Sequence, residues 1–364
     1  MNPIQSAEQV ASTLRAVYNR YGYRQYKMSK FEEYDLYARN KDFLISDSVI
    51  TFTDLSGKLL ALKPDVTLSI VKNSKDSATV QKLYYNENVY RVTKGAQGFR
   101  EIPQLGLECL GPVDDYCISE VLTLAATTLR QISDLAVLDI SHLGILSEVL
   151  SSIGIADHQR GAVAKLIGEK NLHELTALCR ELNVSEEGIA LLRQLLTLRS
   201  PLTGSALSNL LTGYVKSETL THFNAVLSAL AETDLAPLLR IDFSVVDDIS
   251  YYNGFVFKGF VSGLPGSILS GGQYDKLMKK MSRTDRAIGF AVYLDMLQQL
   301  EQPDDGRDVD TLILYDATTP LSAIRARVAE LTAQGQRVMA QQTLPENIRY
   351  QALETLSVEV KENA

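Results

Sequence analysis

The spacing of apolar residues in the first third of the chain predicts one helix followed mainly by strands. From Val10 to Tyr21, apolar side chains recur at helical spacing, and Ser6 is a suitable cap for this helix. Two short runs, 49–53 and 58–62, flank a turn at Gly57 and predict a β-hairpin. The other elements expected in this region are a helix at 66–72, strands at 81–92 and 105–111, and a helix at 119–132 capped by Ser119.

The pattern changes between about residue 144 and residue 234, where Leu and Ala recur with helical period and strand patterns are lacking. We expect an all-helical insertion here, with helix starts or breaks at Asn171, Ser185 and Ser200–Pro201. The elements expected after the insertion are strands at 240–246 and 254–261, a turn at Gly271–Gly272, a helix at 274–281 and a long apolar helix at 287–300.

A linker from Pro303 to Gly306 precedes a region with a different pattern. A strand at 309–315, a helix at 321–333 and a strand at 336–340 form the start of a βαβ unit. We therefore divide the chain into a core of residues 1–302 and a truncated C-terminal α/β module of residues 307–364. The strand-rich core, with helices before, between and after its strands, predicts an α+β fold built on an antiparallel sheet.

The composition excludes several classes of protein. Of 364 residues, 45% are hydrophobic and 22% charged, as in ordinary globular proteins. We expect a cytoplasmic protein without membrane contact, because neither an apolar run long enough to span a membrane nor a secretory signal is evident. Three cysteines and four histidines without ligand spacing predict neither a disulfide framework nor a metal site. The net charge of −8 gives no reason to expect nucleic-acid binding.

Three groups of polar and aromatic residues are candidates for a binding site. Asp65 and Thr67 follow a strand that Pro64 stops, and an acid and a hydroxyl so placed can hold an ammonium group. Taken alone, a capped helix start is the simpler explanation of these two residues. Gln104 and Glu108 share one face of a predicted strand, about 13 Å apart at ~3.3 Å per residue.

Arg91 lies across a glycine-containing loop from Gln104 and Glu108, and the three could grip both ends of an amino acid. Exposed polar positions on a strand would explain them equally well. The third group consists of Tyr251, Tyr252 and Tyr274, which an aromatic hairpin and a helix cap would also explain.

Taken together and in order, these segments resemble the histidyl-tRNA synthetase catalytic core. The similarity spans roughly residues 6–300 and rests on the runs LKPDVT, KLYYNENVYRVTKGAQGFREIPQLGLECLG, SYYNGFVF and GGQYDKL with AIGFAVYLDML. The resemblance implies a class II aminoacyl-tRNA-synthetase-like antiparallel sheet flanked by helices, in a homodimer. It also implies that histidine is recognised by Asp65, Thr67, Arg91, Gln104, Glu108, Tyr252 and Tyr274, with Tyr251 counted beside them.

The chain departs from this family where ATP would react. The family arginine four residues before the tyrosine pair corresponds to Asp247, and the arginine that ends the last class II motif corresponds to Met296. Thr93 and Ser29 stand where the family has a glutamate and a proline. Adenylation develops negative charge that fixed cations must stabilise, and losing one such donor costs about 10²–10³ in rate. We therefore expect no adenylation.

Retained histidine determinants beside an altered ATP site resemble the ATP phosphoribosyltransferase regulatory subunits. This resemblance implies a chain that is not an enzyme by itself and uses no cofactor. It implies activation of a short-form catalytic subunit, inhibition by histidine, and a hetero-octamer containing four copies of each subunit.

Three other functions are kept as alternatives. An active histidyl-tRNA synthetase would form an adenylate with histidine. A synthetase paralogue that binds tRNA would shift tRNA in a gel. A scaffolding homodimer would bind a partner but ignore histidine.

Overall fold

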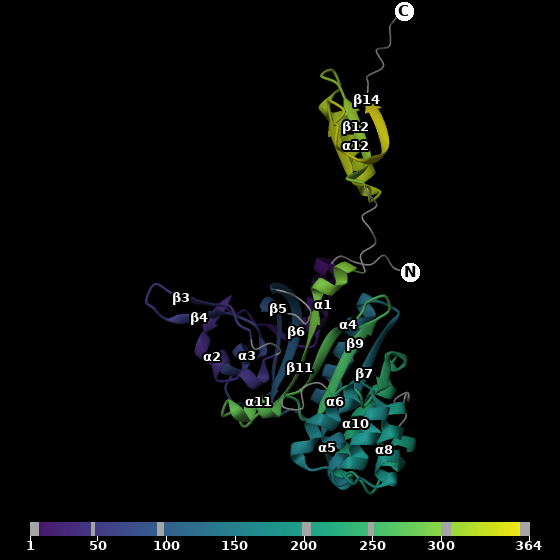
Figure 1. The fold of residues 1–364 in the computed structure, drawn as a ribbon. Helices are drawn as coiled ribbons and strands as arrows, with labels where there is room; N and C mark the ends of the chain where they lie inside the picture. Colours follow the sequence, from purple (N-terminus) through teal and green to yellow (C-terminus); the bar gives the residue numbers. More distant parts are fainter. Residues whose placement is uncertain are drawn as a thin grey trace, which may run out of the picture. The chain divides into compact units, whose positions relative to one another are not determined.

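The computed structural model describes residues 7–44, 48–92, 98–198, 205–246, 251–299 and 307–356. The chain divides into two compact units, Met1–Leu300 and Glu301–Ala364. The first unit contains an eight-stranded sheet, a small three-stranded sheet and most of the helices (Figure 1). The second contains a three-stranded sheet of its own.

The eight-stranded sheet confirms the expected α+β class. Its strands follow the order β1-β5-β6-β11-β10-β9-β7-β8. Neighbours from β5 to β7 are antiparallel, whereas the edge strands β1 and β8 pair in parallel. The strands are β1 (Arg24–Gln25), β5 (Gln81–Val92), β6 (Phe99–Gly111), β7 (Ala136–His142), β8 (Leu239–Ile241), β9 (Phe255–Val261), β10 (Ser267–Gln273) and β11 (Arg286–Tyr293).

The two long strands β5 and β6 pair without a break from Gln81–Leu110 to Val92–Phe99. The strand predicted at 81–92 is confirmed at both ends. The strand predicted at 105–111 was placed too short, since β6 begins at Phe99. Its first residues are mostly exposed and lack apolar alternation, so only their pairing with β5 reveals them as strand.

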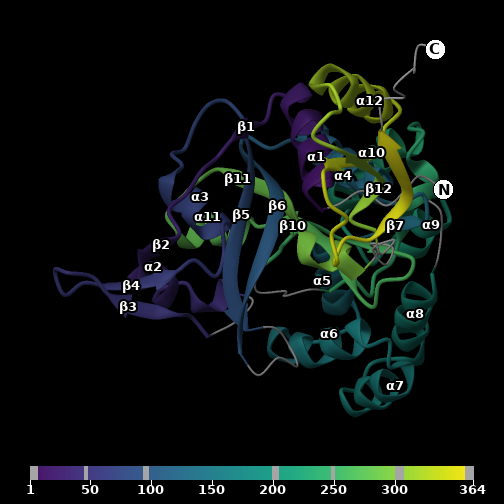
Figure 2. The same ribbon diagram turned by 90° about the horizontal axis from the view of Figure 1, so that it is seen from above.

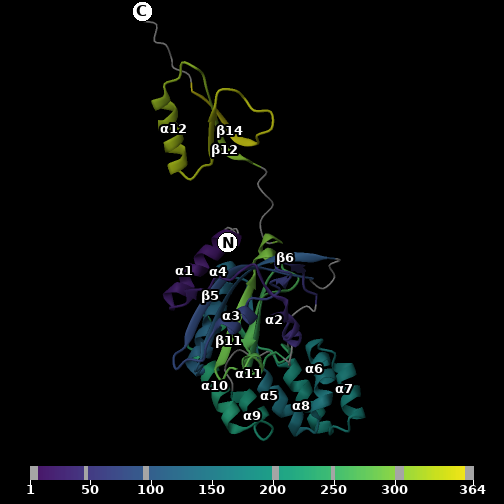
Figure 3. The same ribbon diagram turned by 90° about the vertical axis from the view of Figure 1, so that its left-hand side faces the viewer.

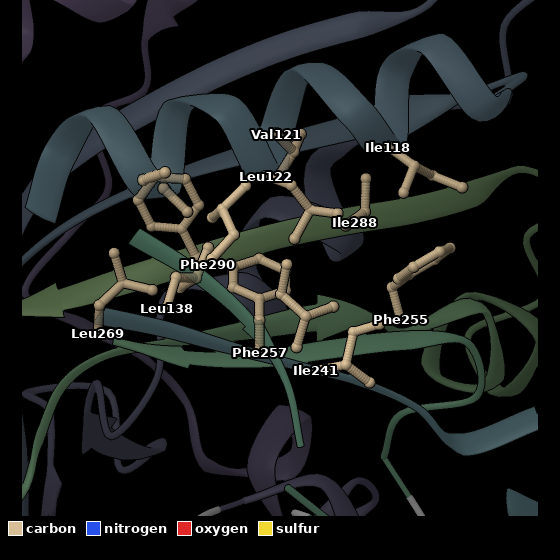
Figure 4. Close-up of a cluster of buried hydrophobic side chains, with 14 of the residues drawn as sticks. Ile118, Val121, Leu122, Leu138, Ile241, Phe255, Phe257, Leu269, Ile288 and Phe290 are labelled. Carbon is tan, nitrogen blue, oxygen red and sulfur yellow. The ribbon is translucent and has the colours of Figure 1, made fainter. Parts of the chain in front are cut away.

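Two helices, α1 (Ala7–Arg20) and α4 (Asp115–Ile132), lie against one face of the sheet. Their buried hydroxyls from Tyr18 and Thr128 hydrogen bond at 2.8 Å. Figure 4 shows Ile118 and Leu122 of α4 beside Ile288 and Phe290 of β11. This packing buries the apolar face of the sheet and leaves the opposite face available for a site. None of the described helices is long and apolar enough to cross a membrane.

Two predictions near the end of the core were wrong. Residues 287–300 do not form one long helix, because β11 occupies Arg286–Tyr293 and a 3₁₀ turn, η4, occupies Leu294–Gln299. Gly271 and Gly272 do not form a turn, because both lie inside β10. A strand buried on both faces has a continuous apolar sequence, which periodicity cannot distinguish from a buried helix.

Between β7 and β8 the described residues form six helices, which cluster at one end of the sheet (Figure 1). Asn171 and Ser185 cap α7 and α8 as predicted, whereas Ser200–Pro201 lies outside the described residues. The strand predicted at 240–246 ends at Ile241, and β7 was not predicted. The helices are α5 (Leu143–Ser152), α6 (Arg160–Gly168), α7 (Leu172–Glu181), α8 (Glu186–Thr197), α9 (Ser205–Leu211) and α10 (Ser217–Ala231), with turns η2 (Asp157–Gln159) and η3 (Ala236–Leu238).

The predicted hairpin is confirmed and extends away from the rest of the core (Figure 2). Its turn contains Gly57, whose φ of 84° suits a residue without a side chain. One hairpin strand, β4, also pairs with β2, which gives a second sheet of order β2-β4-β3. The elements here are β2 (Phe31–Glu33), α2 (Tyr34–Ala38), η1 (Lys41–Phe43), β3 (Thr51–Thr53), β4 (Leu59–Leu62) and α3 (Thr67–Asn73), and α11 (Asp275–Lys280) follows β10.

The second unit has a parallel sheet of order β13-β12-β14 with α12 packed on it (Figure 3). The predicted strand β12 (Val309–Tyr315) and helix α12 (Leu321–Ala333) are confirmed. The next strand, β13, occupies Val338–Gln341 rather than 336–340. A further strand, β14 (Tyr350–Leu356), completes the sheet and was not predicted.

Helix α4 provides a test of local stability, because its start was placed wrongly at Ser119. The carboxylate of Asp114 accepts a hydrogen bond from the Cys117 N–H at 2.9 Å and caps the helix. We expect Asp114→Ala to lower the free energy of unfolding by about 1 kcal/mol. The matched Ser119→Ala should change it by less than about 0.5 kcal/mol, as measured by urea unfolding. Equal losses in both variants would contradict the cap assignment.

Candidate functional site

The face of the sheet opposite α4 carries a row of aligned residues across five strands. Tyr85 pairs with Gly106, Gly106 with Ala291, Ala291 with Ser270, and Ser270 with Lys258. Directly opposed residues point to the same face of a sheet. The small residues at the middle of this row leave space above the sheet, and larger side chains border it at either end.

That space is a cavity of about 400 Å³. Beside the strands, its walls come from η1, the start of α3 and the segments that precede β9 and α11. The structure brings every residue of the predicted site to this cavity, although they come from five separate segments of the chain. The lining includes Asp65, Thr67, Arg91, Gln104, Glu108, Tyr251, Tyr252 and Tyr274.

The centre of the cavity is the carboxylate of Glu108. The hydroxyl of Thr67 donates a hydrogen bond to Glu108 Oε1 at 2.7 Å, and the hydroxyl of Tyr274 donates to Oε2 at 2.6 Å. Burial raises the pKa of Glu108 to about 8, although the two hydrogen bonds oppose this shift. The protein therefore presents a buried acid that a cationic ligand group would stabilise in its ionised form.

A second acid, Asp65, lies beside the first. Its Oδ1 accepts a hydrogen bond from the Leu68 N–H at 2.8 Å, which fixes it at the start of α3. Burial raises the pKa of Asp65, while hydrogen bonds to the backbone and the positive charge of Arg91 oppose the rise. Two acids and one arginine at this end of the cavity favour a ligand with a cationic group.

Arg91 is buried at the end of β5, and its guanidinium carbon lies 5.7 Å from the centre of the Tyr293 ring. This is a cation–π distance. The Tyr293 hydroxyl lies 2.9 Å from the Ser270 hydroxyl, so the tyrosine extends from the arginine toward the middle of the cavity. Gln104, directly opposite Tyr293 in the sheet, adds an amide that can donate or accept.

Aromatic rings close the cavity on another side. The rings of Tyr251 and Tyr252 meet edge to face at 4.6 Å, and Tyr251 lies 5.9 Å from Tyr274 and 5.7 Å from Phe43. Aromatic rings in tilted or edge-to-face contact attract one another. They provide an apolar surface against which a flat ring can pack.

A buried polar network holds these tyrosines in place. The Asn253 side chain donates to Asp275 Oδ2 at 3.0 Å and accepts from the Asp275 N–H at 2.8 Å. Asp275 also accepts from the Ala287 N–H at 3.0 Å, and Gln273 accepts from the Phe255 N–H at 2.7 Å. The segment bearing Tyr251 and Tyr252 is thereby bonded to the segment bearing Tyr274.

Gly289 shows how closely the site is packed. A Cβ at this position would lie 1.8 Å from Glu108 Oε2 and 2.5 Å from the Leu107 carbonyl oxygen. Only a residue without a side chain leaves the Glu108 carboxylate in its position. The glycine in β11 is thus a requirement of the site as well as of the sheet.

Sequence reasoning missed several lining residues, notably Tyr85, Lys258, Ser270 and Tyr293. Tyr85 could have been found from its strand alternation with Glu87 and Leu83, but the facing strand was unknown. Tyr293 was assigned to a helix. No local signal distinguishes Lys258 and Ser270, because their place in the site depends on the order of strands in the sheet.

The positions that depart from the synthetase pattern lie partly outside the described residues. Asp247 and Thr93 fall there. Met296 lies in η4, half-buried against the main hydrophobic core, and does not line the cavity. Among the residues that the structure describes, no group of three His, Cys, Asp or Glu side chains is placed to hold a metal ion.

The buried acid at the centre predicts a pH-dependent stability. The pKa of Glu108 rises from an ordinary 4.5 to about 8 on folding. Ionising Glu108 in the folded protein therefore lowers the free energy of unfolding. This loss is absent below about pH 4.5, grows as the pH rises, and reaches its full size above about pH 8. We expect Glu108→Gln to gain stability over the wild type as pH rises through this window, by at most about 1.4 kcal/mol per pH unit. Urea unfolding at pH 5, 7 and 9 measures this, and parallel stability curves would contradict it.

Comparison with known proteins connects this site to one family. Residues 2–297 match the family model described as Histidyl-tRNA synthetase. The ATP phosphoribosyltransferase regulatory subunit of Oceanobacillus iheyensis is 28% identical over 309 residues, which cover 81% of this chain and 75% of that protein. The protein of the same name from Caldanaerobacter subterraneus is 28% identical over 296 residues, covering 79% and 76%.

Solved structures agree in fold. An ATP phosphoribosyltransferase regulatory subunit/histidyl-tRNA synthetase from Bacillus halodurans superposes with a TM-score of 0.78 at 25% identity, covering 96% of this chain and 93% of that one. A histidyl-tRNA synthetase from Nostoc superposes with a TM-score of 0.72 at 15% identity, covering 94% of this chain and 83% of that one. A chain of the ATP phosphoribosyl transferase (HisG:HisZ) complex from Thermotoga maritima superposes with a TM-score of 0.62 at 18% identity. This match covers 78% of the present chain and 96% of that one. The chain therefore belongs to the histidyl-tRNA synthetase family and is similar within it to the regulatory subunits of ATP phosphoribosyltransferase.

Proposed function

We propose that the chain is the regulatory subunit of a short-form ATP phosphoribosyltransferase. In this role it binds and activates the catalytic subunit, which joins ATP and phosphoribosyl pyrophosphate to give phosphoribosyl-ATP and pyrophosphate. Histidine, the end product of the pathway that this reaction begins, binds to the chain and lowers the activity of the complex. The observation that carries the proposal is that the eight histidine-site residues inferred from the sequence line one cavity.

The chemistry of the cavity supports histidine as the ligand. Its volume of about 400 Å³ lies within the range of small-molecule sites. Histidine has an ammonium, a carboxylate and an imidazole that can become cationic near pH 6.5. Asp65 and Glu108 suit the two cationic groups, the tyrosine rings suit the flat imidazole, and a basic side chain is required for the carboxylate.

The same site is poorly suited to activating histidine with ATP. Asp247 and Met296 replace the two arginines that the synthetase resemblance implies for that step. An acidic residue where negative charge develops opposes the reaction instead of stabilising it. A site that binds the amino acid without consuming it can act as a sensor.

Sensing requires that histidine bind two states of the complex unequally. A buried acid such as Glu108 is suited to this, because it links the start of α3, β6 and the segment before α11 through its two hydrogen bonds. A ligand group that takes over one of these bonds changes how those elements are held. We infer a cytoplasmic hetero-octamer, with the catalytic subunits as partners and dimers of this chain within it.

The first test mixes the purified chain with a short catalytic subunit. We expect the mixture to show phosphoribosyltransferase activity well above that of the catalytic subunit alone, and added histidine to reverse the gain. Pyrophosphate release measures the activity, and titration calorimetry measures histidine binding. Absence of activation would refute the regulatory role, and activation without any response to histidine would favour a scaffold.

The second test removes single side chains from the cavity. We expect Glu108→Ala and Tyr252→Ala to raise the histidine concentration for half-inhibition about 10- to 100-fold, as expected when a hydrogen bond to a charged group is lost. Each variant is compared with its own activity in the absence of histidine. Glu101→Ala, an exposed residue of the same strand as Glu108, is the matched control. Equal inhibition of all four proteins would place histidine elsewhere.

A further inference from the structure

The cavity contains more positive charge than the sequence analysis assigned to it. Among the described residues, its basic side chains are Arg91 and Lys258. Arg91 ends β5, whereas Lys258 lies in the middle of β9, on the other side of the sheet's central strands. The carboxylate of an amino-acid ligand therefore has two basic side chains in the cavity to which it could bind.

Arg91 belongs to the acidic end of the cavity. Burial raises the pKa of Asp65, and the positive charge of Arg91 opposes this rise; the Arg91 guanidinium faces the Tyr293 ring. Arg91 thus already interacts with an acid and an aromatic ring of the protein. If the ammonium and the imidazole of the ligand occupy Asp65 and Glu108, the carboxylate is directed away from this end, because it would compete with the protein's own acids for the arginine.

Lys258 stands at the opposite end. It lies three strands across the sheet from Glu108, about 14 Å at ~4.8 Å per strand, and two residues along β9 from the row of Glu108, about 7 Å at ~3.3 Å per residue. Both residues line the cavity. Its direct neighbour on β10 is Ser270, whose hydroxyl lies 2.9 Å from that of Tyr293. Since one hydroxyl of such a pair donates to the other, a second O–H remains available to donate to a ligand.

We propose that Lys258, together with the Ser270–Tyr293 hydroxyl pair, binds the carboxylate of the amino-acid ligand. This assignment rests on the proposed function and extends it. It identifies the protein side chains that recognise the carboxylate, which an amino acid has and the corresponding amine lacks. A flexible ammonium beside two hydroxyls suits a carboxylate. Lys258 is thus a specificity-determining residue for the ligand.

Titration calorimetry of the full chain with histidine and with histamine tests the assignment, because histamine keeps the amine and the imidazole but lacks the carboxylate. We expect the wild type to bind histidine at least about tenfold more tightly than histamine. Lys258→Gln should weaken histidine binding at least about tenfold while changing histamine binding less than about twofold. Lys258→Arg, which keeps the charge, should preserve the preference and shows whether loss of binding reflects misfolding.

Lys279→Gln is the matched control. Lys279 is an exposed lysine in the last turn of α11 and does not line the cavity. We expect it to leave the preference for histidine unchanged. If Lys258→Gln weakens both ligands equally, or if Arg91→Gln alone abolishes the preference, the assignment is wrong. A wild type that binds neither ligand would instead overturn the proposed function on which the assignment rests.

Discussion

The hydrogen bonds that Thr67 and Tyr274 donate to the Glu108 carboxylate hold together three segments far apart in the sequence. Each segment depends on a different part of the fold: β6 on its long pairing with β5, Thr67 on the start of α3, and Tyr274 on the network around Asp275. A buried carboxylate is costly without such partners, so its presence constrains the positions of all three. The cavity exists in its observed form because this group is held at its centre.

Space matters as much as charge in this site. Gly106, Ala291 and Gly289 lie at the middle of the sheet, where larger residues would fill the cavity or displace the Glu108 and Tyr85 side chains. On the other face, α1 and α4 cover the same strands with closely packed apolar residues. The sheet therefore has one face packed into the core and one that lines the cavity, which is the division expected of an antiparallel sheet.

The side chains lining the cavity carry charges of both signs. Asp65 and Glu108 lie at one end with Arg91, and Lys258 lies across the sheet beside Ser270. A synthetase-like fold with such a pocket can serve regulation, because binding alone is enough to shift an equilibrium between two states. This accounts for a synthetase-like fold in a chain similar to regulatory subunits.

The sequence by itself determined the elements whose signals are local. Strand 81–92, the hairpin at Gly57 and helix 321–333 were placed correctly because alternation, turn chemistry and helical period act over a few residues. The residues proposed to bind histidine could be named only through resemblance to a family. Tertiary structure decided that residues 286–293 form a strand, and that Tyr293, Ser270 and Lys258 meet Glu108 in one cavity. The physical reason is that an apolar run becomes a strand or a helix according to what it packs against, and that side chains on different strands meet only once strand order and register are set.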